Sequence, residues 1–225
     1  MPFTVEETAI PEVLVVRPSL FADDRGWFTE ILQADAFAGL GVGLPERFVQ
    51  VNQSRSVRGV IRGLHFQWDP PQGKLMRVVT GRAFMVAVDI RPGSPTLGRV
   101  VTLEASSDEP VLFWAPASFA RGFAALSDVA EIEYFCTAAY NPACETGIRW
   151  DDPALGIAWP VEEPLLSPKD AAAGTLADWL ARPESAVFAA PVGGSRAAWP
   201  RRGPRDVVAA AVLSIGARIH ARVAA

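Results

Sequence analysis

From about residue 10 to residue 160, short apolar stretches alternate with clusters of Gly, Pro, Asp and Asn. Short apolar runs bounded by such turn-forming residues are typical of β-strands rather than helices. The pattern therefore predicts an all-β chain with many short strands. Because half of the 225 residues are apolar, the chain can bury a substantial core, in one large β-rich domain or in two small ones.

Three stretches give the most specific strand predictions. Residues 76–91 contain a run that is apolar on both parities, which predicts a strand covered on both faces. Residues 91–96 are dense in turn-forming residues. The strand predicted at 98–105 should therefore be the antiparallel neighbour of the strand that precedes this turn. In the strand predicted at 130–139, Glu131 and Glu133 occupy one face and mostly apolar residues the other, so Tyr134 should point inward.

Helices are predicted to be few. Residues 35–40 and 170–180 are free of Pro and rich in Ala and Leu, which favours two short helices. The domain is predicted to span residues 1–182, followed by a segment rich in Pro, Gly and Arg. Residues 206–223 carry apolar side chains at spacings of three and four, which predicts an amphipathic C-terminal helix. We expect it to pack on its own domain or on a subunit partner; binding to a membrane surface is a lesser alternative, because its cationic face is small.

Composition limits the classes of partner. The net charge is −4, with 21 basic and 25 acidic residues, so we expect no general basic surface and no nucleic-acid partner. The N-terminus does not resemble a secretory signal and no window is apolar enough for a membrane span, so we expect a cytoplasmic protein that does not bind membranes. Cys136 and Cys144 are expected to be reduced packing residues.

His65 is the only histidine before residue 220. A catalytic metal needs three or four clustered ligands, and no second histidine lies nearby, so we predict no metal site. A lone histidine is often a satisfied core residue. However, several polar residues surround His65 in the sequence, and burying them without partners would be costly. We therefore predict a cleft, in which a bulge at Gly63 could turn Arg62 and His65 toward the same face.

Several motifs occur in the order seen in one known family: Arg62-Gly63-Leu64-His65-Phe66-Gln67, Pro71-Gln72-Gly73-Lys74, Val86-Ala87-Val88-Asp89-Ile90-Arg91, Ser94-Pro95-Thr96 and Leu166-Ser167-Pro168-Lys169-Asp170. Over about residues 17–170, the chain resembles the dTDP-4-dehydrorhamnose 3,5-epimerase family, metal-free sugar-nucleotide epimerases of the cupin superfamily. The resemblance implies a jelly-roll barrel, usually a homodimer, that acts on a dTDP-4-keto-6-deoxy sugar without a cofactor.

The resemblance also implies a role for each site residue. His65 would remove a proton from a carbon beside the ketone, with Asp170 orienting its imidazole. Lys74 would stabilise the enolate oxygen, and Tyr134 would donate a proton on the opposite face. The residues expected to bind the substrate are Arg25, Glu30, Gln50, Asn52, Arg62, Arg121, Tyr140, Glu145 and Lys169. In the family, the groups that match Arg25 and Glu30 can come from the neighbouring subunit.

Arg121 departs from the family, which commonly has histidine at that position. Arginine is larger and stays charged, so the pocket beside the sugar should differ in field and shape. Three functions therefore remain open: a double epimerase acting on both carbons beside the ketone, a single-carbon epimerase of another deoxysugar pathway, and a catalytically silent sugar-nucleotide-binding or assembly protein.

Overall fold

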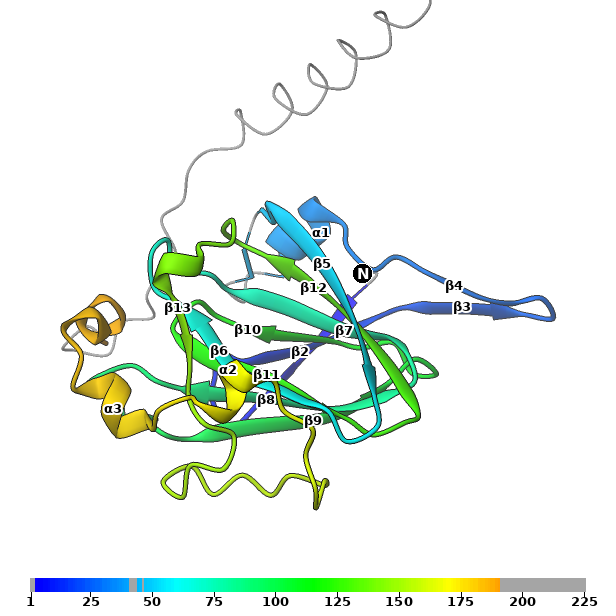
Figure 1. Cartoon of the computed structure of the whole chain (residues 1–225). Helices are drawn as coiled ribbons and strands as arrows, with labels where there is room; N and C mark the ends of the chain where they lie inside the picture. Colours follow the sequence, from blue (N-terminus) through cyan, green and yellow to red (C-terminus); the bar gives the residue numbers. More distant parts are fainter. Residues whose placement is uncertain (1–2, 41–43, 46, 191–225) are drawn as a thin grey trace, which may run out of the picture. The chain divides into compact units, whose positions relative to one another are not determined.

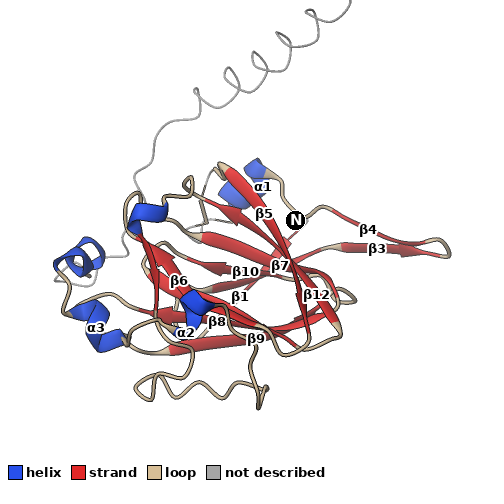
Figure 2. Ribbon diagram, viewed as in Figure 1, coloured by secondary structure: helices blue, strands red, loops and turns tan. Residues whose placement is uncertain are grey.

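The computed structural model describes residues 3–40, 44–45 and 47–190. Two antiparallel sheets face each other (Figures 1 and 2). The six strands of the first follow the order β1 (Phe3–Glu7), β2 (Leu14–Pro18), β10 (Leu112–Ala115), β7 (Lys74–Thr80), β12 (Val129–Cys136) and β5 (Gln50–Val57). The five strands of the second follow the order β13 (Glu145–Gly147), β6 (Ile61–Gln67), β11 (Phe119–Ala125), β8 (Arg82–Asp89) and β9 (Val100–Ser106). This is a cupin-like jelly roll, as predicted.

The main core fills the space between the two sheets. Along each strand alternate side chains point to this interior, as the two-residue period of a strand requires. The first sheet contributes fully or nearly fully buried side chains such as Phe113 and Ile132, and the second contributes Met85 and Phe119. Tyr134 packs against the same cluster, which confirms its predicted inward direction.

Helices and loops cover the outer faces of the sheets. Helix α1 (Ala34–Gly39) buries Phe37 against the first sheet, where its ring centroid lies 4.7 Å from that of Phe3. On the second sheet, α3 (Leu176–Leu180) and the 3₁₀ helix η2 (Pro183–Phe188) bury Trp179 and Phe188 against Phe66. The remaining short helices are η1 (Pro142–Cys144) and α2 (Pro168–Ala171).

Two predicted elements differ from those observed. The run predicted as one strand at residues 76–91 is two strands, β7 and β8, because the chain turns at Gly81 with φ of +78°. The helix predicted at 170–180 is interrupted. The Thr175 side chain accepts a hydrogen bond from the backbone of Asp178 and begins a separate helix, α3. By contrast, the helix predicted at 35–40 and the pairing of β8 with β9 are confirmed.

The predicted linker and C-terminal helix beyond residue 190 lie outside the described residues. The domain boundary at residue 182 stays a prediction. In the structure, η2 follows directly after that position, and Phe188 is 5% exposed in the cluster around Trp179. The described fold therefore continues at least to this helix.

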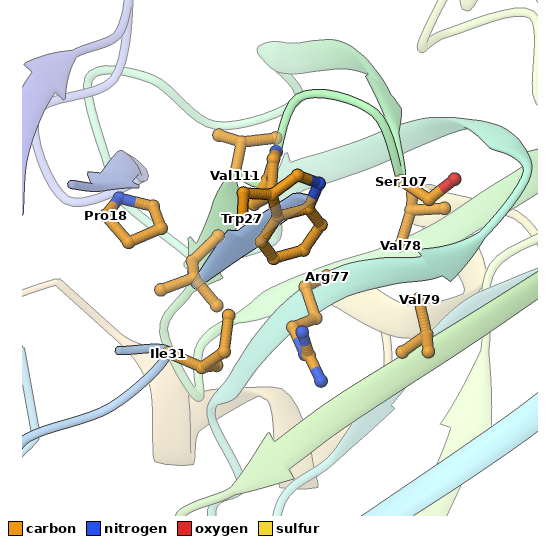
Figure 3. A pocket seen from close by; sticks show the side chains of 10 residues that line it. Pro18, Trp27, Ile31, Arg77, Val78, Val79, Ser107 and Val111 are labelled. Carbon is orange, nitrogen blue, oxygen red and sulfur yellow. The ribbon is translucent and has the colours of Figure 1, made fainter. Parts of the chain in front are cut away.

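A separate two-stranded hairpin, β3 (Leu20–Asp23) and β4 (Gly26–Thr29), extends away from the two sheets (Figure 1). Its aromatic side chains are largely exposed, at 59% for Phe21, 50% for Trp27 and 64% for Phe28. Trp27 of β4 and Ile31, which follows the hairpin, line a cavity of about 30 Å³ together with Arg77 and other residues of β7 and β10 (Figure 3). This cavity is far too small for the sugar nucleotide that the family resemblance implies.

Candidate active site

A histidine and an aspartate from distant parts of the chain form the centre of the site. His65 Nε2 lies 2.5 Å from Asp170 Oδ1, and Asp170 is only 4% exposed. Ser167 caps helix α2: its hydroxyl accepts from the Asp170 backbone and donates to Asp170 Oδ2 at 2.9 Å. Burial raises the pKa of Asp170, but the hydrogen bonds with His65 and Ser167 outweigh it and hold the pKa below its usual range. A charged Asp170 can therefore orient the imidazole of His65.

A bulge in β6 determines which way His65 points. In the pairing of β11 with β6, Arg121 stands opposite His65 and Phe123 stands opposite Arg62. A step of two residues along β11 therefore matches a step of three residues along β6. The extra residue places Arg62 and His65 on the same face, as predicted from Gly63. Gly63 has φ of +136°, and a Cβ there would lie 2.6 Å from the Cα of Gly122. Only glycine fits between these strands, so the bulge depends on it.

Lys74 and Tyr134 come from the first sheet. Lys74 begins β7, and its Nζ lies 4.9 Å from the centroid of the Tyr134 ring. Burial lowers the pKa of Lys74 to about 8, with a further contribution from the positive charge of Arg121. Burial also raises the pKa of the Tyr134 hydroxyl, which therefore keeps its proton at neutral pH. The pair thus supplies a cation and a proton donor.

Arg121 connects the two sides of the site. It stands opposite His65 in the β11–β6 pairing, and it is 2% exposed. Its Nη1 donates to the Phe119 carbonyl at 2.5 Å, and its Nη2 donates to the carbonyl of Gln72, two residues before Lys74. The sequence predicted a substrate ligand here, but the guanidinium is directed to the protein's own main chain.

Four of the predicted substrate-binding residues are close to these groups. Asn52 of β5 pairs with Tyr134, and its side chain accepts a hydrogen bond from Gln50 at 3.0 Å. Gln50 also accepts from the backbone N–H of Tyr140 at 2.9 Å. Arg62 donates to the Ser56 hydroxyl at 3.0 Å. The Tyr140 ring is 54% exposed, so it is free to stack on a ligand.

Glu145 and Lys169 form an ion pair beside the histidine–aspartate pair. A cavity of about 270 Å³ lies here, lined by His65, Thr146, Gly147, Lys169, Asp170, Ala172, Ala173 and Gly174. Because the cavity reaches both His65 and Lys169, a bound molecule can contact the base and a cation at once. Lys169 lines this cavity and Glu145 is its ion-pair partner, so their roles in binding stay predictions.

Arg25 and Glu30 are not brought to this site within one chain. Arg25 lies at the turn of the hairpin between β3 and β4, and Glu30 directly follows β4. Within the described residues, the polar contacts of Arg25 are all with Asp23. Neither residue lines the cavity beside His65, so their predicted binding roles stay predictions.

Sequence reasoning missed three contributors to the site. Ser167 orients Asp170, and the Ser-Pro-x-Asp pattern of a helix start was the available signal. Gln72 is 3% exposed and donates from its side chain to the Ala138 carbonyl at 2.7 Å, which anchors the loop before Lys74. Cys136 is fully buried, 3.8 Å from the Asn52 amide nitrogen. Cys136 and Cys144 are both free thiols, as expected.

Two further properties concern only the described part of the chain. It brings together no group of three or more His, Cys, Asp or Glu side chains that could hold a metal ion. It also contains no helix long and apolar enough to cross a membrane.

Comparison with known proteins agrees with this geometry. The family model for dTDP-4-dehydrorhamnose 3,5-epimerase matches residues 7–178. A protein of that name from Neisseria gonorrhoeae is 45% identical over 80% of this chain, which spans 54% of that relative's length. A dTDP-4-dehydrorhamnose 3-epimerase from Streptomyces niveus is 41% identical over 75% of this chain and 82% of its own.

A solved structure extends the likeness to three dimensions. The crystal structure of dTDP-6-deoxy-D-glucose-3,5-epimerase from Legionella pneumophila, in complex with dTDP-4-keto-L-rhamnose, superposes with a TM-score of 0.77 at 45% identity. The match covers 81% of this chain and 96% of that one. The fold and the family implied by the sequence motifs are thus confirmed, and the chain belongs to the dTDP-4-dehydrorhamnose 3,5-epimerase family.

Proposed function

We propose that this protein epimerises a dTDP-4-keto-6-deoxy sugar at both carbons beside the ketone. The observation that carries the proposal is the short His65–Asp170 contact at the edge of a cavity, with Lys74 and Tyr134 grouped on the facing sheet. A hydrogen on a carbon beside a ketone can be removed by a positioned base when the resulting enolate is stabilised. Inversion then needs a proton donor on the other face.

Each residue has one role in this mechanism. Neutral His65 takes the proton, and Asp170 stabilises the imidazolium that forms. The Lys74 ammonium group stabilises the negative charge that develops on the ketone oxygen. Tyr134, whose raised pKa keeps it protonated, returns a proton to the opposite face. Proton exchange with water then removes the proton from His65 and restores the one on Tyr134, so the same steps can serve the second carbon without a cofactor.

The second candidate function is epimerisation of one carbon only. Arg121 and the similarity to the Streptomyces niveus 3-epimerase favour it. A larger, permanently charged side chain behind the sugar pocket changes its field, and this can determine whether the sugar presents its second carbon to His65.

Solvent exchange separates these candidates. We expect that incubation with dTDP-4-keto-6-deoxy-D-glucose in deuterated water places deuterium at both carbons beside the ketone, as measured by NMR and mass spectrometry of the sugar. Deuterium at one carbon would support the single epimerase. Binding of the nucleotide sugar without any incorporation would contradict both and indicate a silent binding protein for this substrate.

We further propose that the protein works as a cytoplasmic homodimer in which the hairpin between β3 and β4 reaches the partner's site. The hairpin extends away from its own sheets (Figure 1). It carries exposed aromatic rings, and Arg25 lies in the turn between its two strands. In a symmetric dimer, such an arm contributes reciprocally to both sites. Arg25 is suited to the diphosphate, since guanidinium groups bind phosphate oxygens strongly.

Mixing two inactive variants tests this arrangement. Arg25→Ala and His65→Asn homodimers should each be nearly inactive, because each lacks one required group in both sites. After exchange of subunits, a mixed dimer has one complete site, so activity should return to about a quarter of the wild-type level. An inactive mixture that native mass spectrometry shows to contain mixed dimers would place Arg25 in its own subunit's site, and an active Arg25→Ala homodimer would place Arg25 outside catalysis.

A further inference from the structure

Arg121 is a buried cation whose contacts are all with main-chain carbonyls. Besides its bonds to Phe119 and Gln72, Nη1 lies 3.5 Å from the Pro116 carbonyl, and Nε is buried with no partner among the described residues. Burial lowers the pKa of this guanidinium to about 10. Burying a charge without an opposite charge is costly, so a purely structural role would be served better by a neutral side chain.

The carbonyls that Arg121 binds belong to the backbone around Lys74 and His65. Gln72 lies in the loop between β6 and β7, and the next residue, Gly73, donates its N–H to the Thr137 hydroxyl at 2.8 Å. A Cβ at Gly73 would lie 2.5 Å from the Trp114 ring, so the loop packs closely against this ring. Phe119 begins β11, the strand that faces His65. One guanidinium thus ties the start of β7 to the strand opposite the base.

The same guanidinium adds a charge next to Lys74. The ionisable groups that act on Lys74 in the described part of the chain come from three elements. Arg121 of β11 and Lys169 of α2 are cationic, and they disfavour a second cation. Cys136 of β12 acts in the opposite direction and raises the pKa of Lys74, but burial and the charge of Arg121 have the larger effects. Tyr134, also of β12, lies against the Lys74 ammonium group, and its raised pKa keeps it neutral near pH 7.

We infer that Arg121 is a positioning residue that fixes the backbone beside Lys74 and places a permanent positive charge next to its ammonium group. This inference deepens the proposed function, because it rests on the role of Lys74 in the reaction. Arg121 acts through Lys74 and the main chain, so it need not touch the substrate. Together with burial, the charge of Arg121 lowers the pKa of Lys74. Lys74 therefore changes charge close to physiological pH.

The sign of the pH effect follows from the lowered pKa. Lys74 is an ammonium ion below about pH 8 and a neutral amine above it. Enolate stabilisation by Lys74 is therefore lost as the pH rises through that value, and kcat/KM should fall there, because it reports the free enzyme. Removing the Arg121 charge favours the ammonium form and moves this loss to higher pH. Burial continues to act, so the pKa stays below the ordinary value of 10.5.

The chain allows a direct measurement of Lys74, because Lys74 and Lys169 are its two lysines. Carbon-13 labelling of the lysine side chains should give two NMR signals, and Lys169→Arg identifies the one from Lys74. In the full-length protein without ligand, we expect the Lys74 signal to titrate near pH 8. Arg121→Gln should raise that midpoint by about one pH unit. It should also lower kcat more than it raises KM.

Arg82→Gln is the matched control, because Arg82 forms a half-exposed pair with Glu104 and should leave both activity and the Lys74 titration unchanged. If Arg121→Gln does not fold, Arg121→Lys keeps a positive charge, and it should hold the Lys74 midpoint within about 0.5 unit of the wild type. A folded Arg121→Gln variant with an unchanged midpoint, or a folded Arg121→Lys variant with a midpoint raised by a full unit, would overturn the inference. A different result would contradict the proposed function alone. In that case Lys74 would titrate as expected, but a Lys74→Met variant would still epimerise at the wild-type rate.

Discussion

Replacing His65 by asparagine should lower kcat/KM for epimerisation by roughly 10²- to 10⁴-fold, which is the range that a positioned general base contributes. Asparagine has a similar size and polarity but cannot accept the proton. Deuterium uptake at both carbons should fall by the same factor, because each exchange begins with removal of a proton by His65. The measurement is a time course of exchange in deuterated water, followed by NMR.

Binding provides the control for this variant. In the proposed mechanism His65 acts on the sugar and not on the nucleotide, so the affinity for dTDP, measured by calorimetry, should stay within about threefold of the wild type, a change of less than 1 kcal/mol. A His65→Asn protein that binds dTDP and still exchanges protons at the wild-type rate would show that another group is the base.

Replacing Tyr134 by phenylalanine should separate proton removal from inversion. The ring, which packs under Lys74, is kept, but the donor hydroxyl is lost. Net epimerisation should fall by roughly 10²- to 10⁴-fold. Washout of a deuterium label should persist, because His65 can still remove a proton and return one to the same face. Chromatography of the product and mass spectrometry of the label measure the two rates on the same sample.

Tyr140→Phe is the matched control, since the chain has two tyrosines and this change also removes one hydroxyl. Tyr140 is exposed, and its proposed role is to stack on the nucleotide base rather than to take part in proton transfer. Loss of its hydroxyl should therefore leave the ratio of washout to epimerisation unchanged. Equal loss of washout and epimerisation in Tyr134→Phe would mean that Tyr134 supports His65 rather than donating a proton.

Local patterns in the sequence were sufficient for much of the fold and for part of the site. Glu131 and Glu133 alternate with apolar residues, so the inward direction of Tyr134 follows from strand geometry alone. Gly63 likewise indicated the bulge that turns His65, because a strand glycine beside a close backbone neighbour is typical of one. Such features depend on neighbours in the sequence.

Features that depend on distant contacts were not predictable in this way. Asp170 lies 105 residues after His65, and only the family resemblance implied their pairing. The turn at Gly81 was missed because the strands on both sides of it are apolar, so the run has no change of pattern. The direction of the Arg121 guanidinium could not be read from the sequence either, since it is determined by carbonyls from a separate loop.

The order in which the chain is synthesised gives the His65–Asp170 contact a further consequence. The last strand, β13, ends at Gly147, so every strand of both sheets precedes Asp170 on the ribosome. The segment that carries Asp170 then returns to the finished sheets through two bridges, Ile148 with Gly174 and Val60 with Leu165. The strands of both sheets can therefore pair before Asp170 is available to orient His65, so the proposed catalytic pair should form late in folding.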